Sequence, residues 1–244
     1  MKDPGHTTAF CLGFRNWHLA HLVRCLRSIR AQTPSPIVVC DLGSDDAVMP
    51  RLRAAVAAVD GRLVTEIQPE WSRSRALNQA AAGAPPDVLR YVFTDADMLF
   101  PRAWFLAADR VDPLQFFLTR ARDLSESATE ALDGPVTDEW LATQSAVHPQ
   151  VGQGAAMVVP AEWFWKVGGF DEFYQVWGAE DQDLVDRATW DGLPVQWLPE
   201  AWVVHQWHRR DWPTPAQFDV VNRNRVYYRA RGVARGPIVR NKEA

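Results

Sequence analysis

The sequence predicts an α/β fold, in which one domain is built on a mostly parallel central sheet flanked by helices. Two observations support this prediction. Short apolar segments typical of buried strands alternate with segments of helical periodicity through the first hundred residues, and this alternation is typical of βαβ units. In addition, polar residues follow the ends of successive predicted strands, which is the sheet edge at which such folds bind their ligands.

The first part of the chain is predicted to form four strands and three helices. The strands are expected at Thr8–Phe14, Ile37–Cys40, Leu63–Ile67 and, as the central one, Tyr91–Phe93. The helices are expected at His18–Ala31, at Arg51–Val59 and in a segment ending at Ala82 that Ser72 or Ser74 would cap. Each helix would connect two parallel strands by crossing over the sheet.

The second part of the chain is predicted to be less regular. The polar segment from Arg120 to Gln150, which contains Gly134-Pro135, shows no clear strand and suggests a lid or a specificity loop. Later strands are expected at Gln153–Val159, which begins at Gly152-x-Gly154, and at the edge-like segments Val195–Leu198 and Trp202–Val204. Helices are expected at Glu162–Val167 with a Gly168-Gly169 cap, from Glu180 onward, and around Pro215–Tyr228.

Composition narrows the class of function. The 244 residues carry a net charge of −4, so no nucleic-acid partner is expected. The three cysteines, Cys11, Cys25 and Cys40, lack metal-ligand spacing and suit small buried hydrophobes in a reducing compartment. No signal peptide or membrane span is visible, which predicts a soluble, cytoplasmic protein. Most of the twelve tryptophans follow residue 100, which suggests a substrate cleft walled by aromatic rings.

Asp95 and Asp97 follow the central strand directly, and the apolar run Met98–Phe100 comes next. A buried strand end is an unfavourable place for two carboxylates, because each loses hydration and each repels the other. A divalent cation that carries phosphate oxygens would compensate them. The alternative is a pair of solvated loop acids, since Asp-x-Asp is common by chance, but the apolar flanks favour the cation.

A second acidic group opens the helix that begins at Glu180. Glu180, Asp181 and Asp183 follow Trp177-Gly178, and acids in the first turn of a helix are favoured by its dipole. The dipole accounts for one or two acids better than for three after a Trp-Gly turn. These acids are therefore candidates for chemistry as well as for helix capping.

Taken together, these motifs resemble nucleotide-sugar-dependent glycosyltransferases of the GT-A fold, both those of family 2 and the animal β-1,4-galactosyltransferases. The resemblance covers nearly the whole chain, as one domain over residues 1–244 with a nucleotide-binding half (1–100) and an acceptor-binding half (101–244). It rests on five segments in the family's order: Phe14-Arg15-Asn16, Trp71 to Asn78 (similar to aromatic-x-Arg-x-Lys-x-x-Asn), Asp95-Ala96-Asp97, Gly168-Gly169-Phe170 with Trp177 to Asp183, and His205 to Asp211.

The resemblance implies a UDP-sugar donor, with a hexose or an N-acetylhexosamine to be transferred, and Mn²⁺ or Mg²⁺ as the cofactor. The metal ligands would be Asp97, His205 and His208. His205 stands where the family has methionine, and a nitrogen donor should suit Mn²⁺; alternatively, only one of the two imidazoles binds. The residues implied in donor binding are Phe14, Arg15, Asp41, Trp71, Arg75 and Asp95. A core tryptophan and a turn-capping aspartate are the alternatives for Trp71 and Asp41.

For catalysis, the resemblance assigns Asp181 as the base that takes the proton of the acceptor hydroxyl. Trp177, Gly178, Glu180 and Asp183 would bind the acceptor, a small molecule or a glycan. This assignment implies inversion at the anomeric carbon. Polypeptide N-acetylgalactosaminyltransferases carry a related Trp-Gly-Gly-Glu segment and retain configuration, so retention is the alternative. Ala179 replaces the family's second glycine.

Two other functions compete with glycosyl transfer. A nucleotidyltransferase of similar fold also uses Asp-x-Asp, but it should show a Gly-rich phosphate loop with a basic residue after the first strand, which Gly13-Phe14-Arg15-Asn16 does not supply. A non-catalytic sugar-nucleotide-binding protein is the other alternative. The presence of Asp95, Asp97, Asp181 and His208 argues against it.

Overall fold

The computed structural model describes residues 7–134, 137–148, 153–209, 214–234 and 238–240. The strands are β1 (Thr8–Phe14), β2 (Ile37–Asp41), β3 (Arg62–Thr65), β4 (Arg90–Thr94), β5 (Met98–Leu99), β6 (Phe116–Leu124), β7 (Ser145–Val147), β8 (Ala156–Pro160) and β9 (Val195–His205). The helices are α1 (Leu19–Arg30), α2 (Met49–Ala57), α3 (Arg73–Ala82), α4 (Arg102–Ala108), α5 (Glu126–Glu130), α6 (Asp138–Gln144), α7 (Ala161–Lys166), α8 (Glu180–Trp190) and α9 (Pro215–Ala234).

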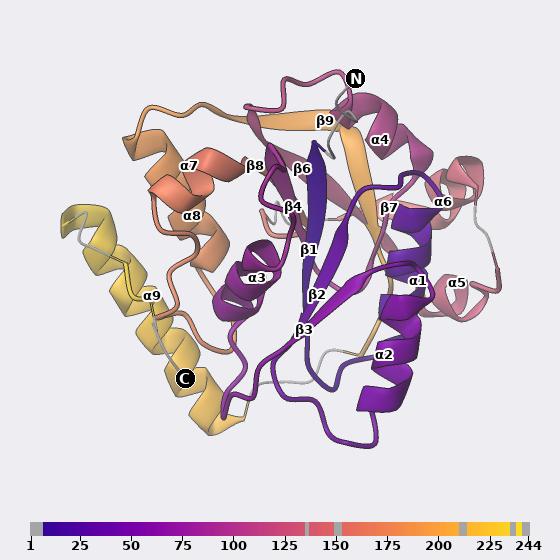
Figure 1. The fold of residues 1–244 in the computed structure, drawn as a ribbon, viewed down its shortest axis with the longest axis horizontal. Helices are drawn as coiled ribbons and strands as arrows, with labels where there is room; N and C mark the ends of the chain where they lie inside the picture. The colour runs from indigo at the N-terminus through magenta and orange to yellow at the C-terminus, as the bar shows by residue number, and fades with distance from the viewer. Residues whose placement is uncertain (1–6, 135–136, 149–152, 210–213, 235–237, 241–244) are drawn as a thin grey trace.

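A single sheet joins all these strands in the order β3-β2-β1-β4-β8-β6-β9-β5, with β7 paired to β6. The pairings within β3-β2-β1-β4 are parallel, as the sequence predicts. β1, β2 and β4 are buried almost throughout, because helices cover both faces of this part of the sheet. Figure 1 shows α1 and α2 on one side of it and α3, α7 and α8 on the other. The α/β prediction is confirmed.

The second part of the sheet differs from the prediction. β8 is antiparallel to β4 and β6, and β9 is parallel to β6 but antiparallel to β5. The sheet is therefore mixed rather than mostly parallel. The two predicted edge-like segments form one strand, β9, inside the sheet, with an irregularity opposite the step from Thr119 to Arg120.

The segment from Arg120 to Gln150 was predicted to be irregular, and this prediction is wrong for the described residues. It contains the end of β6, then α5, α6 and β7. The buried, apolar start of β6 continues into Arg120–Asp123, which are only partly buried, so the polar half of the strand conceals its pattern. Pro135, Gln150 and Gly152 lie outside the described residues, as do Arg210 and Asp211.

Two local predictions are confirmed. Ser72 caps α3, because its hydroxyl oxygen accepts a hydrogen bond of 3.3 Å from the backbone N–H of Arg75. After α7, Gly168 and Gly169 adopt φ angles of +84° and +77°. The N–H of Gly169 donates to the carbonyl of Phe164 at 2.8 Å, which is how a glycine-terminated helix satisfies its last carbonyls.

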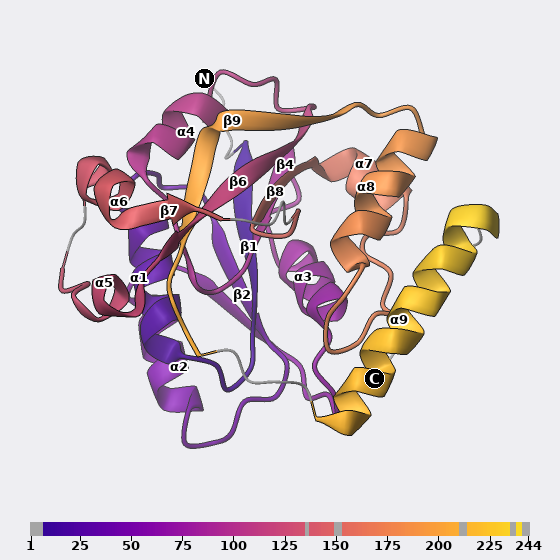
Figure 2. The ribbon, with the colours of Figure 1, turned by 180° about the vertical axis from the view of Figure 1, so that it is seen from behind.

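Two apolar layers pack against the two faces of the sheet. One joins the sheet to α1, α2 and α4, and the other joins it to α3, α7 and α8. Cys11, Cys25 and Cys40 are buried within them as free thiols. Figure 2 shows α9 running along the outside of α8. No helix in the described part of the chain has both the length and the apolar character needed to cross a bilayer.

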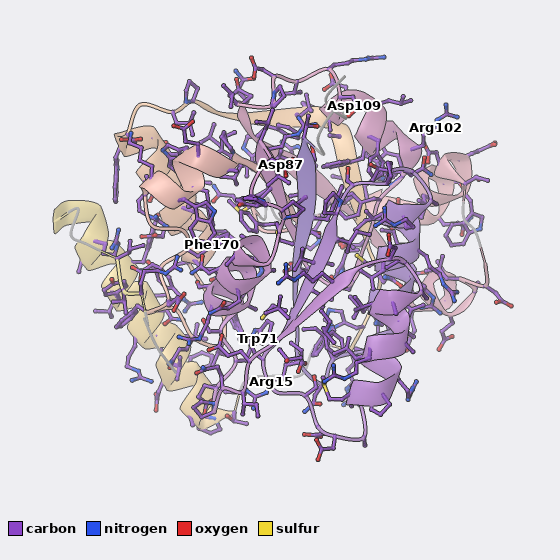
Figure 3. The ribbon with its side chains drawn as sticks, in the orientation of Figure 1. Arg15, Trp71, Asp87, Arg102, Asp109 and Phe170 are labelled. Atoms are coloured by element: carbon purple, nitrogen blue, oxygen red, sulfur yellow. The ribbon has the colours of Figure 1, made fainter. Side chains whose placement is uncertain are left out.

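The strand register brings the predicted functional segments to one edge of the sheet. Phe14 pairs with Asp41, and Thr94, one residue before Asp95, pairs with Leu12. Figure 3 shows Arg15 and Trp71 close together at this edge, whereas Arg102 and Asp109 lie at the opposite end of the molecule. The ends of the parallel strands therefore meet where the sequence predicts ligand binding.

Candidate active site

Asp97, His205 and His208 form one cluster. The Nε2 atom of His205 lies 3.5 Å from Oδ2 of Asp97, and the Nε2 atom of His208 lies 3.4 Å from the same oxygen. One potential ligand atom from each side chain lies within 4.8 Å of the others. The fold produces this cluster because β5, which follows Asp97, pairs Met98 with His205 of β9.

The two imidazoles of the cluster lie nearly perpendicular to each other, with an interplanar angle of 81°, but their nitrogens make the same kinds of contact. Each turns Nε2 toward Asp97, and each has its Nδ1 atom beside an acceptor oxygen. For His208 this acceptor is the carbonyl oxygen of Arg209, 3.1 Å away, and for His205 it is Oδ1 of Asp123, 3.2 Å away. A histidine that binds a metal through one nitrogen usually donates the other N–H to a carbonyl or carboxylate, so both rings suit a cation next to Asp97.

Burial and charge in the cluster also fit a cation. Asp97 is 7% exposed, and among the described residues its Oδ1 atom has no hydrogen-bond partner. Burial would raise the pKa of Asp97, but hydrogen bonds and charge from His205 and His208 hold that pKa well below its usual range. An ionised carboxylate with one oxygen next to two imidazole nitrogens and the other without a partner among the described residues is a suitable donor set for Mn²⁺ or a similar divalent cation.

Arg73 connects the Asp-x-Asp turn to the start of α8. Its Nε donates to Oδ1 of Asp95 at 2.7 Å, its Nη1 to Oδ1 of Asp181 at 2.5 Å and its Nη2 to the carbonyl of Gly154 at 2.9 Å. Burial would lower the pKa of Arg73, but the neighbouring acids raise it. Arg73 was not among the predicted site residues, although it is the arginine of the Trp71-x-Arg73 segment that carries the resemblance.

Asp181 fits its position only because residue 154 is glycine. A Cβ atom at Gly154 would lie 2.1 Å from Oδ2 of Asp181, far inside any permitted contact. The predicted Gly152-x-Gly154 motif thus has one member whose role is visible, namely to leave space for the proposed base.

Glu180 precedes Asp181 and is buried, with 5% exposure. Its Oε2 atom accepts a hydrogen bond of 2.8 Å from the N–H of Gly178. Burial, together with the charge of Asp181, raises the pKa of Glu180 to about 7. The turn before it places Gly178 at φ +113° and Ala179 at φ +71°, so Ala179 adopts a left-handed conformation that glycine adopts more easily.

Trp177 and the predicted donor-side residues have mixed surroundings. Trp177 is 47% exposed and can contact a ligand. The half-buried ring of Trp71 packs so close to Gly13 that a Cβ there would lie 2.9 Å from its Cη2 atom. Arg15 donates to the carbonyl of Pro69 at 3.3 Å. Arg15, Trp71 and Asp95 therefore remain predictions for donor binding.

Two of the predicted donor-binding residues, Phe14 and Asp41, have buried side chains. The side chain of Phe14 is 1% exposed and belongs to the core, because Phe14 is the last inward-facing residue of β1. Asp41 is 2% exposed, and its carboxylate accepts hydrogen bonds from the backbone N–H of Gly43 at 3.2 Å and of Ser44 at 3.1 Å. The turn-capping alternative thus describes Asp41.

The side chains of Arg75 and Asp183 are also buried. Arg75 is 5% exposed and forms ion pairs with Glu66 and Glu172. Asp183 is 1% exposed and is paired with two arginines, Arg187 and Arg231. Both side chains have their charges compensated within the protein, and their roles in binding donor and acceptor stay predictions.

Solved structures with a similar arrangement of elements include three glycosyltransferases. GalNAc-T7 with UDP, GalNAc and Mn²⁺ matches with a TM-score of 0.65 and 15% identity, over 95% of this chain and 52% of that one. The mannosyltransferase PcManGT from Pyrobaculum calidifontis, in complex with GDP-Man and Mn²⁺, matches with a TM-score of 0.62 and 18% identity, over 96% and 66%. The chain has the GT-A fold. The catalytic domain of Drosophila β1,4-galactosyltransferase 7, in complex with xylobiose, matches with a TM-score of 0.51 and 15% identity, over 79% and 65%.

Sequence comparison locates the resemblance in the second half of this GT-A chain. Residues 148–208 match the family model of the N-terminal domain of galactosyltransferase, a segment that includes Asp181, His205 and His208. Validoxylamine A glucosyltransferase from Streptomyces hygroscopicus subsp. jinggangensis is 42% identical over 52 residues, as is the protein of that name from subsp. limoneus. The match covers 21% of this chain and 12% of each relative, so the chain spans a small part of their length.

Proposed function

We propose that this GT-A chain is a metal-dependent, inverting glycosyltransferase that moves a hexose or N-acetylhexosamine from a UDP-sugar to an acceptor hydroxyl. One observation carries the proposal. The Asp-x-Asp turn presents Asp97 to two imidazoles and Asp95 to Arg73, and Arg73 also holds Asp181. A cation site and a candidate base are thus joined at one edge of the sheet.

A divalent cation would be held by Asp97, His205 and His208. Bound there, Mn²⁺ or Mg²⁺ supplies Lewis-acid stabilisation of the charge that develops on a leaving diphosphate. Mn²⁺ is present with UDP in the GalNAc-T7 structure and with GDP-Man in the PcManGT structure, which supports a nucleotide-sugar donor. Arg15, Trp71 and Asp95 are proposed to contact the donor, with UDP preferred over GDP because of the galactosyltransferase-type motifs.

Asp181 is proposed to take the proton of the acceptor hydroxyl as that oxygen bonds to the anomeric carbon. The bond from this carbon to the diphosphate oxygen breaks, and UDP leaves with the electron pair. Arg73 keeps the Asp181 carboxylate oriented next to Asp95. Trp177, Gly178 and Glu180 are proposed to bind the acceptor, and the exposed ring of Trp177 suits the apolar face of a sugar or of another small acceptor.

The relatives named validoxylamine A glucosyltransferase support a hexosyl group as the unit transferred and a small molecule as the acceptor. The matched segment is short, so this support concerns the type of donor and acceptor rather than their identity.

The proposal is tested first by calorimetric titration of UDP, GDP, UMP and a panel of UDP-sugars, with and without Mn²⁺. We expect UDP and its sugars to bind, and Mn²⁺ to strengthen their binding. NMR of the product formed from a turned-over UDP-sugar then reports whether the anomeric configuration inverts. Absence of binding by every nucleotide in the presence of Mn²⁺ would overturn the proposal, and binding of GDP alone would overturn the assignment of the donor.

Asp181→Asn separates turnover from binding. We expect this variant to bind UDP and Mn²⁺ like the unmodified chain and to lose transfer. Asp133→Asn is the matched control, because Asp133 is exposed and its side chain has no hydrogen bond or ion pair within the described residues. Normal transfer by the Asp181 variant would remove Asp181 from the role of base.

A further inference from the structure

His205 differs from a methionine ligand in what it requires of its surroundings. A thioether sulfur binds a metal without needing any second partner. An imidazole has two nitrogens, and it binds through Nε2 only when that atom is unprotonated and the ring is correctly rotated. His205, which stands where the related enzymes have methionine, therefore needs an acceptor for its Nδ1 proton.

Asp123 lies at the position that meets this requirement. Its Oδ1 atom is 3.2 Å from Nδ1 of His205, and its Oδ2 atom is 2.5 Å from Nδ1 of His148. The side chains form one continuous sequence of polar contacts from His148 through Asp123 and His205 to Asp97. In the corresponding place, the Nδ1 atom of His208 has a backbone carbonyl, that of Arg209, as its partner within the described part of the chain.

The sheet itself sets up this arrangement. β9 lies between β5 and β6, so His205 is paired with Met98 on one side and with Asp123 on the other. His148 follows β7, which pairs with the end of β6, and the N–H of His148 donates to the carbonyl of Ala121 at 3.1 Å. Backbone pairing between neighbouring strands of the sheet, β5, β9, β6 and β7, thus fixes the spacing of these side chains.

Neither Asp123 nor His148 is needed to fill the core. The side chain of Asp123 is 31% exposed and that of His148 is 19% exposed. The backbone ladders of β6 with β7 and with β9 hold this region without them. The contact of Asp123 with His205, and that of His148 with Asp123, therefore have a role other than packing.

We propose that Asp123 and His148 are positioning residues that enable His205 to replace methionine as a metal ligand. Asp123 accepts the Nδ1 proton of His205, which leaves the Nε2 lone pair directed at the cation next to Asp97. His148 holds the second carboxylate oxygen of Asp123 and so fixes the direction of the first. This inference rests on the metal centre of the proposed function and goes beyond it by assigning how the unusual ligand is oriented.

The test measures Mn²⁺ affinity directly, by calorimetry and by electron paramagnetic resonance of free Mn²⁺, with no donor or acceptor present. Removal of a partner behind a metal-binding histidine typically weakens metal affinity by about 10- to 100-fold. We therefore expect about a 10-fold loss for Asp123→Ala, which removes the acceptor, a smaller loss for His148→Ala and none for Asp133→Ala. Circular dichroism of each variant verifies that it is folded.

A second background distinguishes positioning from a general structural effect. In His205→Met there is no Nδ1 proton to accept, so adding Asp123→Ala should change Mn²⁺ affinity by less than about 2-fold, a non-additive result typical of residues that act through one another. An equal loss in both backgrounds, or no loss in the unmodified background, would overturn the inference. If the unmodified chain failed to bind Mn²⁺ at all, the metal centre of the proposed function would fall and the inference with it.

Discussion

Two buried acidic clusters in this molecule have opposite electrostatic designs. One is the arginine-paired cluster, in which the carboxylate of Asp183 accepts hydrogen bonds from Nε of Arg187 at 2.8 Å and from Nε of Arg231 at 2.9 Å. Arg231 also forms an ion pair with Asp171 at 3.2 Å. In the metal cluster, by contrast, Asp97 faces the imidazoles of His205 and His208 and retains one buried oxygen without a partner among the described residues.

The difference shows what distinguishes a site from a structural support. Two carboxylates and two guanidinium groups balance each other's charge, so the arginine-paired cluster is neutral without any ligand. Asp97 has no arginine or lysine beside it in the described cluster, and imidazole nitrogens can share a cation with it. Buried acids alone therefore do not identify a catalytic centre; the type of neighbour that compensates them does.

The largest effect that would test this comparison is expected from Asp97→Asn. The variant removes the carboxylate from the donor set, so we expect loss of measurable Mn²⁺ binding and a fall in transfer of about 1,000-fold, since a metal supplies several kcal/mol of transition-state stabilisation. Stability should change little at neutral pH, because an imidazole, unlike a guanidinium, can lose its proton when the carboxylate that faces it is removed. Titration with Mn²⁺, a transfer assay and a urea melt check the three expectations. Mn²⁺ binding of normal strength would show that the metal cluster is misassigned.

Asp183→Asn should have the opposite profile. It leaves two buried guanidinium groups next to a neutral amide, and breaking one partner of a buried ion pair costs about 3 kcal/mol or more. Urea unfolding is expected to show that loss, while the folded protein binds Mn²⁺ with unchanged affinity. A variant of normal stability with impaired acceptor use would return Asp183 to the acceptor-binding role that its sequence position suggests.

Asp181 and Asp183 show which part of the site can be predicted from the sequence and which part cannot. Asp181 and Asp183 lie two residues apart in the same acidic run, but residues two apart on a helix point to nearly opposite sides. Which side faces the site depends on Arg231, 48 positions along the chain, and no local pattern contains that information. The position of Arg75 has the same explanation, since its partner Glu172 lies 97 positions away.

The fold was predictable to a similar degree. β1, β2 and β4 are almost wholly apolar because they are buried on both faces, so their pattern is legible in the sequence. β6 changes from buried to partly exposed at Arg120, and its polar half appears as a loop. Asp123 lies in that half, which is why its contact with His205 was not anticipated although the histidine pair was.

The third prediction concerns the space around Asp181. In Gly154→Ala the new methyl group would lie 2.1 Å from Oδ2 of Asp181, so the carboxylate must move away from Arg73. A misplacement of about 1 Å in a catalytic group can reduce turnover by about 100-fold. We expect a reduction of that order in kcat, with Mn²⁺ affinity unchanged. Gly232→Ala is the control, since a Cβ there meets no atom within 4 Å. Unchanged turnover would show that the position of Asp181 is not critical.

The smallest of the four expected effects concerns Glu180. Its charge is compensated less completely than the charge of Asp183 in the arginine-paired cluster or of Asp97 in the metal cluster. Its pKa is raised from 4.5 to about 7 by burial and by Asp181, so between these values the folded protein holds a proton that the unfolded chain releases. Stability must therefore fall as pH rises through this window. From pH 5.5 to 8 we expect the unmodified chain to lose about 2 kcal/mol relative to Glu180→Gln, given about 1.4 kcal/mol per pH unit.

Urea melts of both proteins across this pH range measure the difference, with the exposed Glu126→Gln as the control that should keep the slope of the unmodified chain. Parallel profiles for the unmodified chain and Glu180→Gln would mean that Arg73, whose Nη1 is 3.9 Å from Oε1 of Glu180, already stabilises the ionised carboxylate. Glu180 would then belong with the arginine-paired acids. A steeper fall in the unmodified chain would instead show that the protein leaves the charge of Glu180 uncompensated, in contrast to that of Asp97, whose pKa the two imidazoles lower.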